Sequence, residues 1–247
     1  MSPALSKGRR VAFFGGSFDP PHLGHLAVAR AARIALGLDT VLFAPVGAQP
    51  LKPVGATASF DDRVAMTKLA IAREPGFAIT LTDAPKVSGA PNYTLETLEN
   101  LQQELGADSA LYCLMGADSL AGLRLWHRAV EIPFVAPLIV ASRPGERMDD
   151  LQSFLPAGLT MERVAASGLP DSDVEVRCYS LLGGSGRWAG LRTPFYLLPG
   201  LDVAISASQI RELTREQARA GATGLAGGQG LLPDAVAEFV KAHGLYQ

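Results

Sequence analysis

The feature that most constrains this chain is a repeated alternation between short apolar runs and longer segments with apolar residues at helical spacing. Segments 24–36, 59–73 and 93–106 have the helical pattern, and each lies between two runs that read as strands. These runs are "RRVAFFGG" (9–16), "TVLFAPVG" (40–47), "FAITLTDA" (77–84), "ALYCLMG" (110–116) and "PFVAPLIVASRPG" (133–145). Near-continuous apolar strands alternating with helices indicate a parallel sheet covered on both faces. We therefore expect an α/β chain with a Rossmann-like, doubly wound parallel sheet.

Beyond residue 145 the alternation weakens. Segment 181–190, "LLGGSGRWAG", is predicted to be a loop, and the apolar segments 192–200 and 201–206 are candidates for further strands. Helices are predicted over 206–220 and over 233–244, joined by the glycine-rich linker 222–232. The sequence thus predicts a single domain over 1–247 with a small C-terminal helical part at 206–247.

Composition excludes several classes of function. The net charge is −2, whereas proteins that bind nucleic-acid backbone are usually more basic. No apolar run approaches the roughly 20 residues that span a bilayer, and the apolar stretch after the first basic residues is too short for a signal peptide. Two cysteines are too few for a disulfide framework or a cysteine zinc site. We expect a cytoplasmic protein with no nucleic-acid or membrane partner.

The loop after the first predicted strand, "GGSFDPPHLGHL" (15–26), holds two of the four histidines in the chain. In an open parallel sheet, ligands bind beyond the carboxyl ends of the strands, where this loop falls. Gly15 and Gly16 allow a ligand to approach the backbone, and the helix that starts near His22 and His25 favours an anion. A zinc site would need further ligands, and a third interpretation has the two histidines only capping the helix. The pattern favours a phosphate-binding loop.

Two segments resemble the signatures of a known superfamily. "GGSFDPPHLGHL" resembles the first signature of the H-x-G-H nucleotidyltransferases, and "ISASQIRE" (205–212), about 180 residues later, resembles the second. The blocks "FAPVGAQPLKP", "NYTLETLENL" and "LMGADSLAGLRLWHRAVEI" between them are similar to bacterial nicotinate-nucleotide adenylyltransferases. The resemblance covers most of 9–145 and 194–246, and it implies the nucleotidyltransferase fold.

The resemblance implies transfer of the adenylyl group of ATP to nicotinate mononucleotide, giving deamido-NAD and pyrophosphate. The attacking phosphate is already anionic, so the reaction needs positioning and charge stabilisation rather than a general base. Mg²⁺ is expected to enter with ATP, with no protein ligand named. Two alternatives stay open: a transferase acting on nicotinamide mononucleotide or another phosphate ester, and a non-catalytic ATP-binding regulatory domain.

The resemblance also assigns site residues. The implied catalytic residues are His22, His25 and Arg211. The residues implied to bind ATP are Gly15, Gly16, Ser17, Phe18, His22, His25, Gly116, Asp118, Ser206, Ser208 and Arg211. Those implied to bind nicotinate mononucleotide are Lys52, Tyr93, Thr94 and Trp126.

Most of these residues also have a plain structural interpretation. Ser206 and Asp118 suit helix caps, while Arg211 and Lys52 suit solvated surface charges. Trp126 suits core packing. These alternatives stay open at the level of sequence.

The chain departs from the family pattern in three places. Leu51 stands where histidine is frequent, and Ala207 lacks a hydroxyl that the second signature usually carries. Residues 146–193 match poorly, and a lid, an oligomer contact or a disordered insert would each fit this segment. Arg143 has a family counterpart to which we assign no role, and a homo-oligomer is compatible with the sequence.

Overall fold

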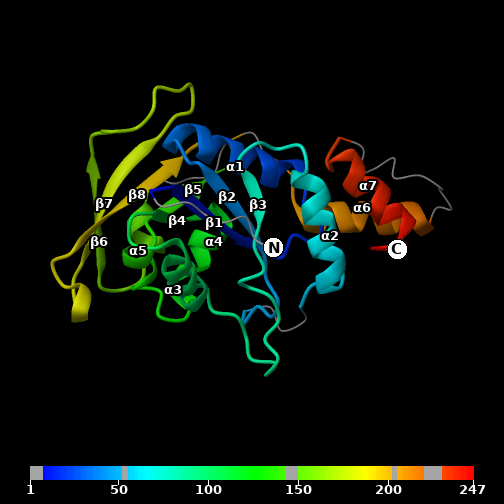
Figure 1. The fold of residues 1–247 in the computed structure, drawn as a ribbon, viewed down its shortest axis with the longest axis horizontal. Helices are drawn as coiled ribbons and strands as arrows, with labels where there is room; N and C mark the ends of the chain where they lie inside the picture. The colour runs from blue at the N-terminus through cyan, green and yellow to red at the C-terminus, as the bar shows by residue number, and fades with distance from the viewer. Residues whose placement is uncertain (1–7, 52–54, 143–149, 202–204, 220–229) are drawn as a thin grey trace.

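The computed structural model describes residues 8–51, 55–142, 150–201, 205–219 and 230–247. Its strands form one sheet of eight, in the order β3-β2-β1-β4-β5-β8-β7-β6 (Figure 1). The strands are β1 (Arg10–Gly16), β2 (Thr40–Pro45), β3 (Phe77–Ile79), β4 (Ala110–Gly116), β5 (Leu138–Ala141), β6 (Leu159–Val164), β7 (Arg177–Gly183) and β8 (Arg192–Leu198). The helices are α1 (Leu23–Leu36), α2 (Phe60–Ile71), α3 (Thr94–Leu105), α4 (Ala117–Gly122), α5 (Ile132–Val135), α6 (Ala207–Arg219) and α7 (Asp234–Ala242), with short 3₁₀ turns at 123–125, 151–154 and 186–188.

Strands β1 to β5 and β8 are parallel, and the strand order reverses between β1 and β4. The chain first builds outward from β1 through β2 to β3 and then builds from β4 in the other direction. Gly16 pairs with Pro45 and Gly116 pairs with Ala141, so the strands on both sides of this reversal end at one edge of the sheet. A reversal of this kind opens a crevice beyond the carboxyl ends of the strands, where ligands bind in doubly wound sheets.

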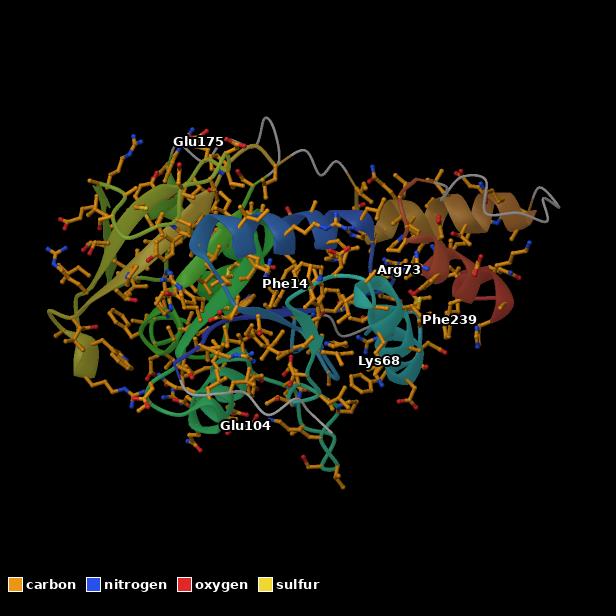
Figure 2. All side chains as sticks on the ribbon, turned by 45° about the horizontal axis from the view of Figure 1, so that its top comes forward. Phe14, Lys68, Arg73, Glu104, Glu175 and Phe239 are labelled. Atoms are coloured by element: carbon orange, nitrogen blue, oxygen red, sulfur yellow. The ribbon has the colours of Figure 1, made fainter. Side chains whose placement is uncertain are left out.

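Helices cover both faces of the sheet, which confirms the predicted fold class. Along β1, Val11 and Phe13 pack in one apolar core with α3, α4 and α5, while Ala12 and Phe14 pack in the other with α1, α2, α6 and α7. Phe14 lies inside the molecule, whereas Glu104 points outward from its surface (Figure 2). Burial on both faces explains why the strands read as continuous apolar runs. Among the residues described, no helix has the length and apolar character that crossing a membrane requires.

Three predicted segments need correction. Residues 133–135 are helical, and the strand predicted over 133–145 begins only at Leu138, because Pro133 stands in the first turn of α5 where proline is favoured. The strand predicted over 77–84 ends at Ile79. Segment 181–190 is not one loop, since β7 continues to Gly183. Residues 202–204 and 220–229 lie outside the described residues, so the predicted strand at 201–206 and the linker cannot be compared in full.

The described part of the poorly matching segment 146–193 extends the sheet. Strand β7 pairs antiparallel with β8, and β6 pairs antiparallel with β7 at the edge of the sheet (Figure 1). The connection between β7 and β8 is fastened to α5, where the rings of Phe134 and Trp188 stack with centroids 4.9 Å apart. Glu131 accepts hydrogen bonds there from Arg128, Arg187 and Trp188.

Candidate active site

A cavity of about 920 Å³ lies beyond the carboxyl ends of β1, β4 and β5, at the point where the strand order reverses. This volume is near the upper end of the range of about 300–1,000 Å³ for ligand pockets. The structure places nearly every candidate residue of the sequence around it. The cavity lining includes Gly15, Gly16, Ser17, Phe18, His22, His25, Tyr93, Thr94, Gly116, Asp118, Trp126, Ser206, Ser208 and Arg211. Lys52, the remaining candidate, lies outside the described residues, as does Arg143.

Packing requires at least one of the two glycines that end β1. A Cβ atom on Gly15 would lie 2.7 Å from the ring of Phe13, which is buried. A Cβ atom on Gly16 would lie 3.3 Å from the ring of Phe18. The packing of the core therefore requires the first glycine.

The two histidines pack against each other at the start of α1. His22 is the N-cap residue of the helix, and its backbone N–H donates to Nδ1 of His25 over 3.2 Å. The two ring centroids are 3.7 Å apart, and the ring of Phe18 meets that of His25 edge-on at 5.0 Å. Because Nδ1 of His25 accepts a hydrogen bond, the ring proton of the neutral imidazole is on Nε2. Helix capping by this pair thus occurs, and it leaves His25 with an N–H donor on the opposite side of its ring.

The start of α1 offers fewer N–H groups to a ligand than its sequence suggests. The N–H of Leu23 donates to the carbonyl of Leu231 over 2.9 Å, and the N–H of His25 donates to the carbonyl of His22 over 2.9 Å. The helix dipole still favours an anion at this end. Side chains must nevertheless supply more of the hydrogen bonds to a bound phosphate than an open helix end would require.

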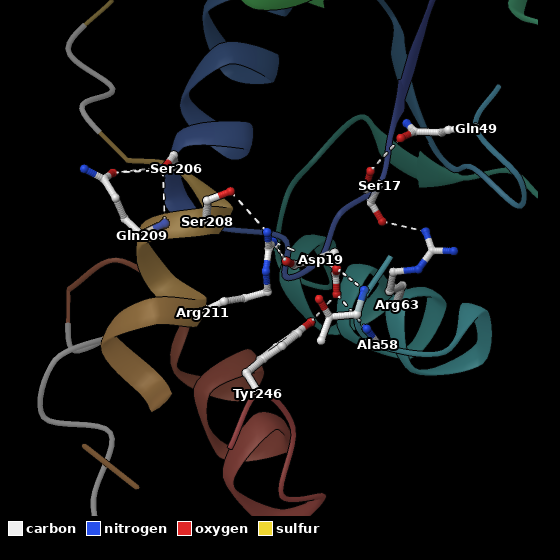
Figure 3. Close-up of polar contacts among 11 residues, drawn as sticks. Ser17, Asp19, Gln49, Ala58, Arg63, Ser206, Ser208, Gln209, Arg211 and Tyr246 are labelled. Atoms are coloured by element: carbon white, nitrogen blue, oxygen red, sulfur yellow. Dashed lines mark hydrogen bonds and ion pairs between the residues drawn. The ribbon is translucent and has the colours of Figure 1, made fainter. Parts of the chain in front are cut away.

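Residues of the second signature also line the cavity. Ser206 caps α6, because its Oγ accepts the N–H of Gln209 over 3.2 Å while Oε1 of Gln209 accepts the N–H of Ser206 over 3.1 Å. Arg211 donates to the carbonyl of Asp19 over 2.6 Å and to Oγ of Ser208 over 3.1 Å (Figure 3). Its side chain is 21% exposed, so it is not a solvated surface charge. The guanidinium has five N–H groups, and these two bonds use two of them.

Asp19 fastens the first loop to three other parts of the chain, and sequence reasoning missed it. Its carboxylate is buried and accepts hydrogen bonds from the N–H of Thr57 at 2.6 Å, the N–H of Ala58 at 3.0 Å and the hydroxyl of Tyr246 at 2.8 Å (Figure 3). Burial is the main cause that raises the pKa of Tyr246, and the neighbouring carboxylate raises it further, so this phenol is the donor. In the sequence, Asp19 stands between glycines and prolines and resembles an ordinary turn residue. Its structural role becomes visible only from its burial and its hydrogen bonds.

A second buried charge, Arg63 of α2, binds two backbone segments that line the cavity. Its guanidinium donates to the carbonyl of Ser17 over 2.6 Å and to that of Val46 over 2.8 Å. Arg63 is 2% exposed, and burial lowers its pKa while the charge of Asp19 opposes that shift. In the sequence this arginine reads as part of the polar face of a helix. Its role in joining the ends of β1 and β2 emerges only from the fold.

The other end of the cavity carries flat rings and amide groups. The rings of Tyr93 and His127 lie with centroids 4.4 Å apart and their planes tilted by 34°, and Trp126 is partly buried against the core while it also lines the cavity. Trp126 therefore packs against the core and also has a face on the cavity.

Asn92 joins two loops at this end, because its Oδ1 accepts the N–H of Ala48 and its Nδ2 donates to the carbonyl of Ala84, each over 2.9 Å. Asn92 directly precedes Tyr93 in a block that the sequence already marked, yet it was not singled out.

Asp83 and Asp118 differ in their surroundings. Asp83 is buried, accepts a hydrogen bond from Oγ1 of Thr97 over 2.8 Å, and has its pKa raised by burial. Asp118 lies in the first turn of α4, whose N-cap is Gly116. The alternative that Asp118 caps this helix is therefore wrong. Its carboxylate lies beside the cavity at a helix start, where the dipole favours negative charge.

Within the described ranges, no group of three or more His, Cys, Asp or Glu side chains is arranged to hold a metal ion. Two of the three departures from the family pattern, Leu51 and Ala207, lie on the cavity lining. Leu51 is 54% exposed at its rim, and Ala207 is the first residue of α6.

Comparison with known proteins gives one consistent result. The model of the Cytidylyltransferase-like family matches residues 13–213. A probable nicotinate-nucleotide adenylyltransferase of Gloeobacter violaceus is 37% identical over 239 residues, covering 97% of each chain. A probable nicotinate-nucleotide adenylyltransferase of Stenotrophomonas maltophilia is 36% identical, covering 95% of this chain and 96% of the relative.

A solved structure supports the fold. The chain superposes with a TM-score of 0.64 on Plasmodium falciparum nicotinic acid mononucleotide adenylyltransferase complexed with NaAD, over 96% of this chain and 97% of that one. The sequence identity is 14%, so this likeness concerns the fold alone. The full-length similarity to the two bacterial relatives settles the family: the chain belongs to the nicotinate-nucleotide adenylyltransferases.

Proposed function

We propose that this protein transfers the adenylyl group of ATP to nicotinate mononucleotide, forming deamido-NAD and pyrophosphate in NAD synthesis. The family supports this reaction, and one observation in the structure supports its location. Arg211 of the second signature donates to the carbonyl of Asp19 in the first signature, 192 residues away, so that both line one cavity. Residues that resemble phosphate-binding segments in sequence thereby form one continuous surface.

The chemistry asks for hydrogen-bond donors around two polyanions. A phosphate oxygen of the mononucleotide attacks the α-phosphorus of ATP, and the bond from that phosphorus to the pyrophosphate oxygen breaks. Charge gathers on the α-phosphate and on the departing pyrophosphate. We assign the Nε2–H of His25 to the α-phosphate and His22 to the phosphates beside it. An imidazole whose Nδ1 accepts a hydrogen bond can donate from Nε2, and the anionic nucleophile needs no base.

We assign the β- and γ-phosphates to the start of α6. Arg211 retains N–H groups beyond the two that its protein contacts use, and a guanidinium recognises phosphate through paired donors. The hydroxyls of Ser206 and Ser208 lie on the same cavity wall. Replacement of a second hydroxyl by Ala207 leaves these two in place, so phosphate binding is expected to survive that departure.

Mg²⁺ is proposed to enter as the ATP complex. The carboxylate of Asp19, beside Arg211, accepts hydrogen bonds on both oxygens from Thr57, Ala58 and Tyr246, so three of its roughly four lone-pair sites are engaged. Mg²⁺ commonly binds through substrate phosphates and water, and when bound it would neutralise part of the phosphate charge.

The opposite end of the cavity is assigned to the pyridine ring and the ribose groups. Trp126 and Tyr93 offer aromatic faces to a flat ring, and Thr94 starts helix α3, whose N–H groups favour a carboxylate. Asp118 and Gly116 line the cavity at the carboxyl end of β4, where a carboxylate can accept from ribose hydroxyls of ATP. Lys52 remains a proposed contact that lies outside the described residues.

The assay that tests this function supplies ATP, Mg²⁺ and an acceptor, and measures pyrophosphate. Release with nicotinate mononucleotide but little with nicotinamide mononucleotide is the expected result. Release only with another phosphate ester would contradict the proposed acceptor. Binding of ATP without turnover of any acceptor would instead indicate a regulatory domain.

The role of His25 has its own test. Replacing His25 with alanine is expected to lower kcat by about 10²-fold or more, as for loss of one transition-state donor. His25→Asn is the matched variant, because its amide can still donate near the α-phosphate, and it should retain more activity than His25→Ala. Unchanged kcat in His25→Ala would refute the assignment.

A further inference from the structure

The C-terminal segment, residues 231–246, contacts both ends of the loop 19–23, which carries His22 and is called the His22 loop below. At the start of this loop, the hydroxyl of Tyr246 donates to Oδ1 of Asp19 over 2.8 Å. At its end, the carbonyl of Leu231 accepts the N–H of Leu23 over 2.9 Å. Residues 231–246 therefore hold the backbone that presents His22, although Tyr246 itself is not on the cavity lining.

Tyr246 is held in place by strong tertiary constraints. Its backbone φ is 66°, a value that residues with a side chain rarely adopt, and its side chain is 5% exposed. The ring packs in the same apolar core as Val236 and Val240 of α7 and Ile210 of α6. The hydroxyl at the end of this buried ring reaches the carboxylate of Asp19 (Figure 3).

A short chain of contacts leads from this hydroxyl to Arg211, the proposed donor to the β- and γ-phosphates. Among the described residues, the carboxylate of Asp19 has three hydrogen-bond donors, and Tyr246 is the one of these three that donates from its side chain. The backbone carbonyl of the same residue accepts Nη1 of Arg211 over 2.6 Å, and that nitrogen lies 3.9 Å from Oδ2. Because both groups belong to Asp19, holding its carboxylate in place also holds the backbone carbonyl that accepts the hydrogen bond from Arg211.

We infer that Tyr246 is a positioning residue that acts through Asp19 to hold Arg211 in its working orientation for adenylyl transfer. This inference rests on the proposed function. Loss of the hydroxyl leaves Oδ1 of a buried carboxylate with one donor, the N–H of Ala58. The first loop then gains freedom to turn, and the guanidinium loses its fixed relation to His22 and His25.

The test compares Tyr246→Phe with the wild-type protein in steady-state assays with ATP, Mg²⁺ and nicotinate mononucleotide. The variant keeps the buried ring and removes only the hydroxyl. We expect kcat to fall about tenfold, equivalent to about 1.4 kcal/mol. The KM for nicotinate mononucleotide should stay within about twofold, since uniform binding of that substrate is untouched. The matched control is Tyr112→Phe. Tyr112 of β4 is 8% exposed and does not line the cavity, so this variant should leave kcat unchanged.

A double-mutant cycle separates positioning from general stability. Tyr246→Phe is combined with Arg211→Lys at a temperature where circular dichroism shows every variant folded. If Tyr246 acts through Arg211, the double variant loses no more kcat than Arg211→Lys alone. Multiplied losses, or a kcat of Tyr246→Phe within about twofold of wild type, would overturn the inference. Should Tyr246→Phe fail to fold, the same cycle with Asp19→Asn decides it.

A binding measurement distinguishes failure of this inference from failure of the proposed function. If the wild-type protein binds ATP–Mg²⁺ but does not turn over nicotinate mononucleotide, the function fails and calorimetry of ATP binding becomes the readout. Tyr246→Phe should then weaken ATP binding about fivefold in the wild-type background and leave it unchanged with Arg211→Lys. Equal ATP affinities of wild type and Tyr246→Phe would overturn the inference, and absence of ATP binding to the wild type would overturn both.

Discussion

The buried guanidinium of Arg63 predicts a large loss of stability in Arg63→Met. Methionine keeps the length of the side chain but removes two charge-assisted hydrogen bonds, to the carbonyls of Ser17 and Val46, worth about 1.5–3 kcal/mol each. It also removes the positive charge near Asp19, while the cost of burying a cation is recovered. The net loss should be about 3–5 kcal/mol, as when one partner of a buried polar network is removed.

Urea denaturation followed by far-UV circular dichroism measures this loss. For a chain of this size, about 3–5 kcal/mol lowers Tm by roughly 6–20 °C. The stability of Arg63→Lys should lie between those of wild type and Arg63→Met, because the lysine ammonium keeps the charge but cannot reproduce the paired donors of the guanidinium. The control is Arg73→Met, an exposed arginine (Figure 2), expected within about 0.5 kcal/mol of wild type. If Arg63→Met unfolds within about 1 kcal/mol of wild type, the guanidinium does not hold the two strand ends and the reasoning fails.

Two predictions concern pH. Arg128, with Trp188 and Arg187, lowers the pKa of Glu131 to about 2. Wild type should therefore be more stable than Glu131→Gln by about 1 kcal/mol, the value for an ion pair near the surface. In urea titrations this difference should be complete above the ordinary pKa of 4.5 and should be lost as pH falls toward 2. Burial raises the pKa of Asp83 above 3.8, so wild type should lose stability relative to Asp83→Asn as pH rises from that value. The same denaturation series checks both, and a difference that does not change with pH would contradict either one.

Local pattern predicted much of this fold because the strands are buried on both faces and the helices on one. The apolar runs at β1, β2 and β4 and the cap at Ser59 appear where the sequence predicts them, since period and capping act over a few residues. The predictions failed where context decides. The strand β3 ends at Ile79 because its length depends on pairing with β2, and the helix at 132–135 depends on how the chain turns before β5.

The candidate site divides in the same way. Residue type and spacing were enough to select His22 and His25 from the sequence, and the hydroxyls before Arg211 could be selected because their segment resembles a family signature. Residues that hold these groups from behind could not. Asp19, Arg63 and Tyr246 have partners 17 to 227 positions away, and nothing in their local sequence distinguishes them from turn, surface or core residues.

The sequence by itself thus determined the class of the sheet, because side-chain periodicity is carried by short stretches. It also predicted a ligand edge and a first phosphate-binding segment from donor chemistry, and a second such segment from a family resemblance. Only the tertiary structure decided that the first helix start is partly occupied by Leu231, that Arg211 rests on Asp19, and that the C-terminal segment supports this contact. The partner of a buried charge or carbonyl can lie far away in the sequence, and only the complete fold brings the two groups together.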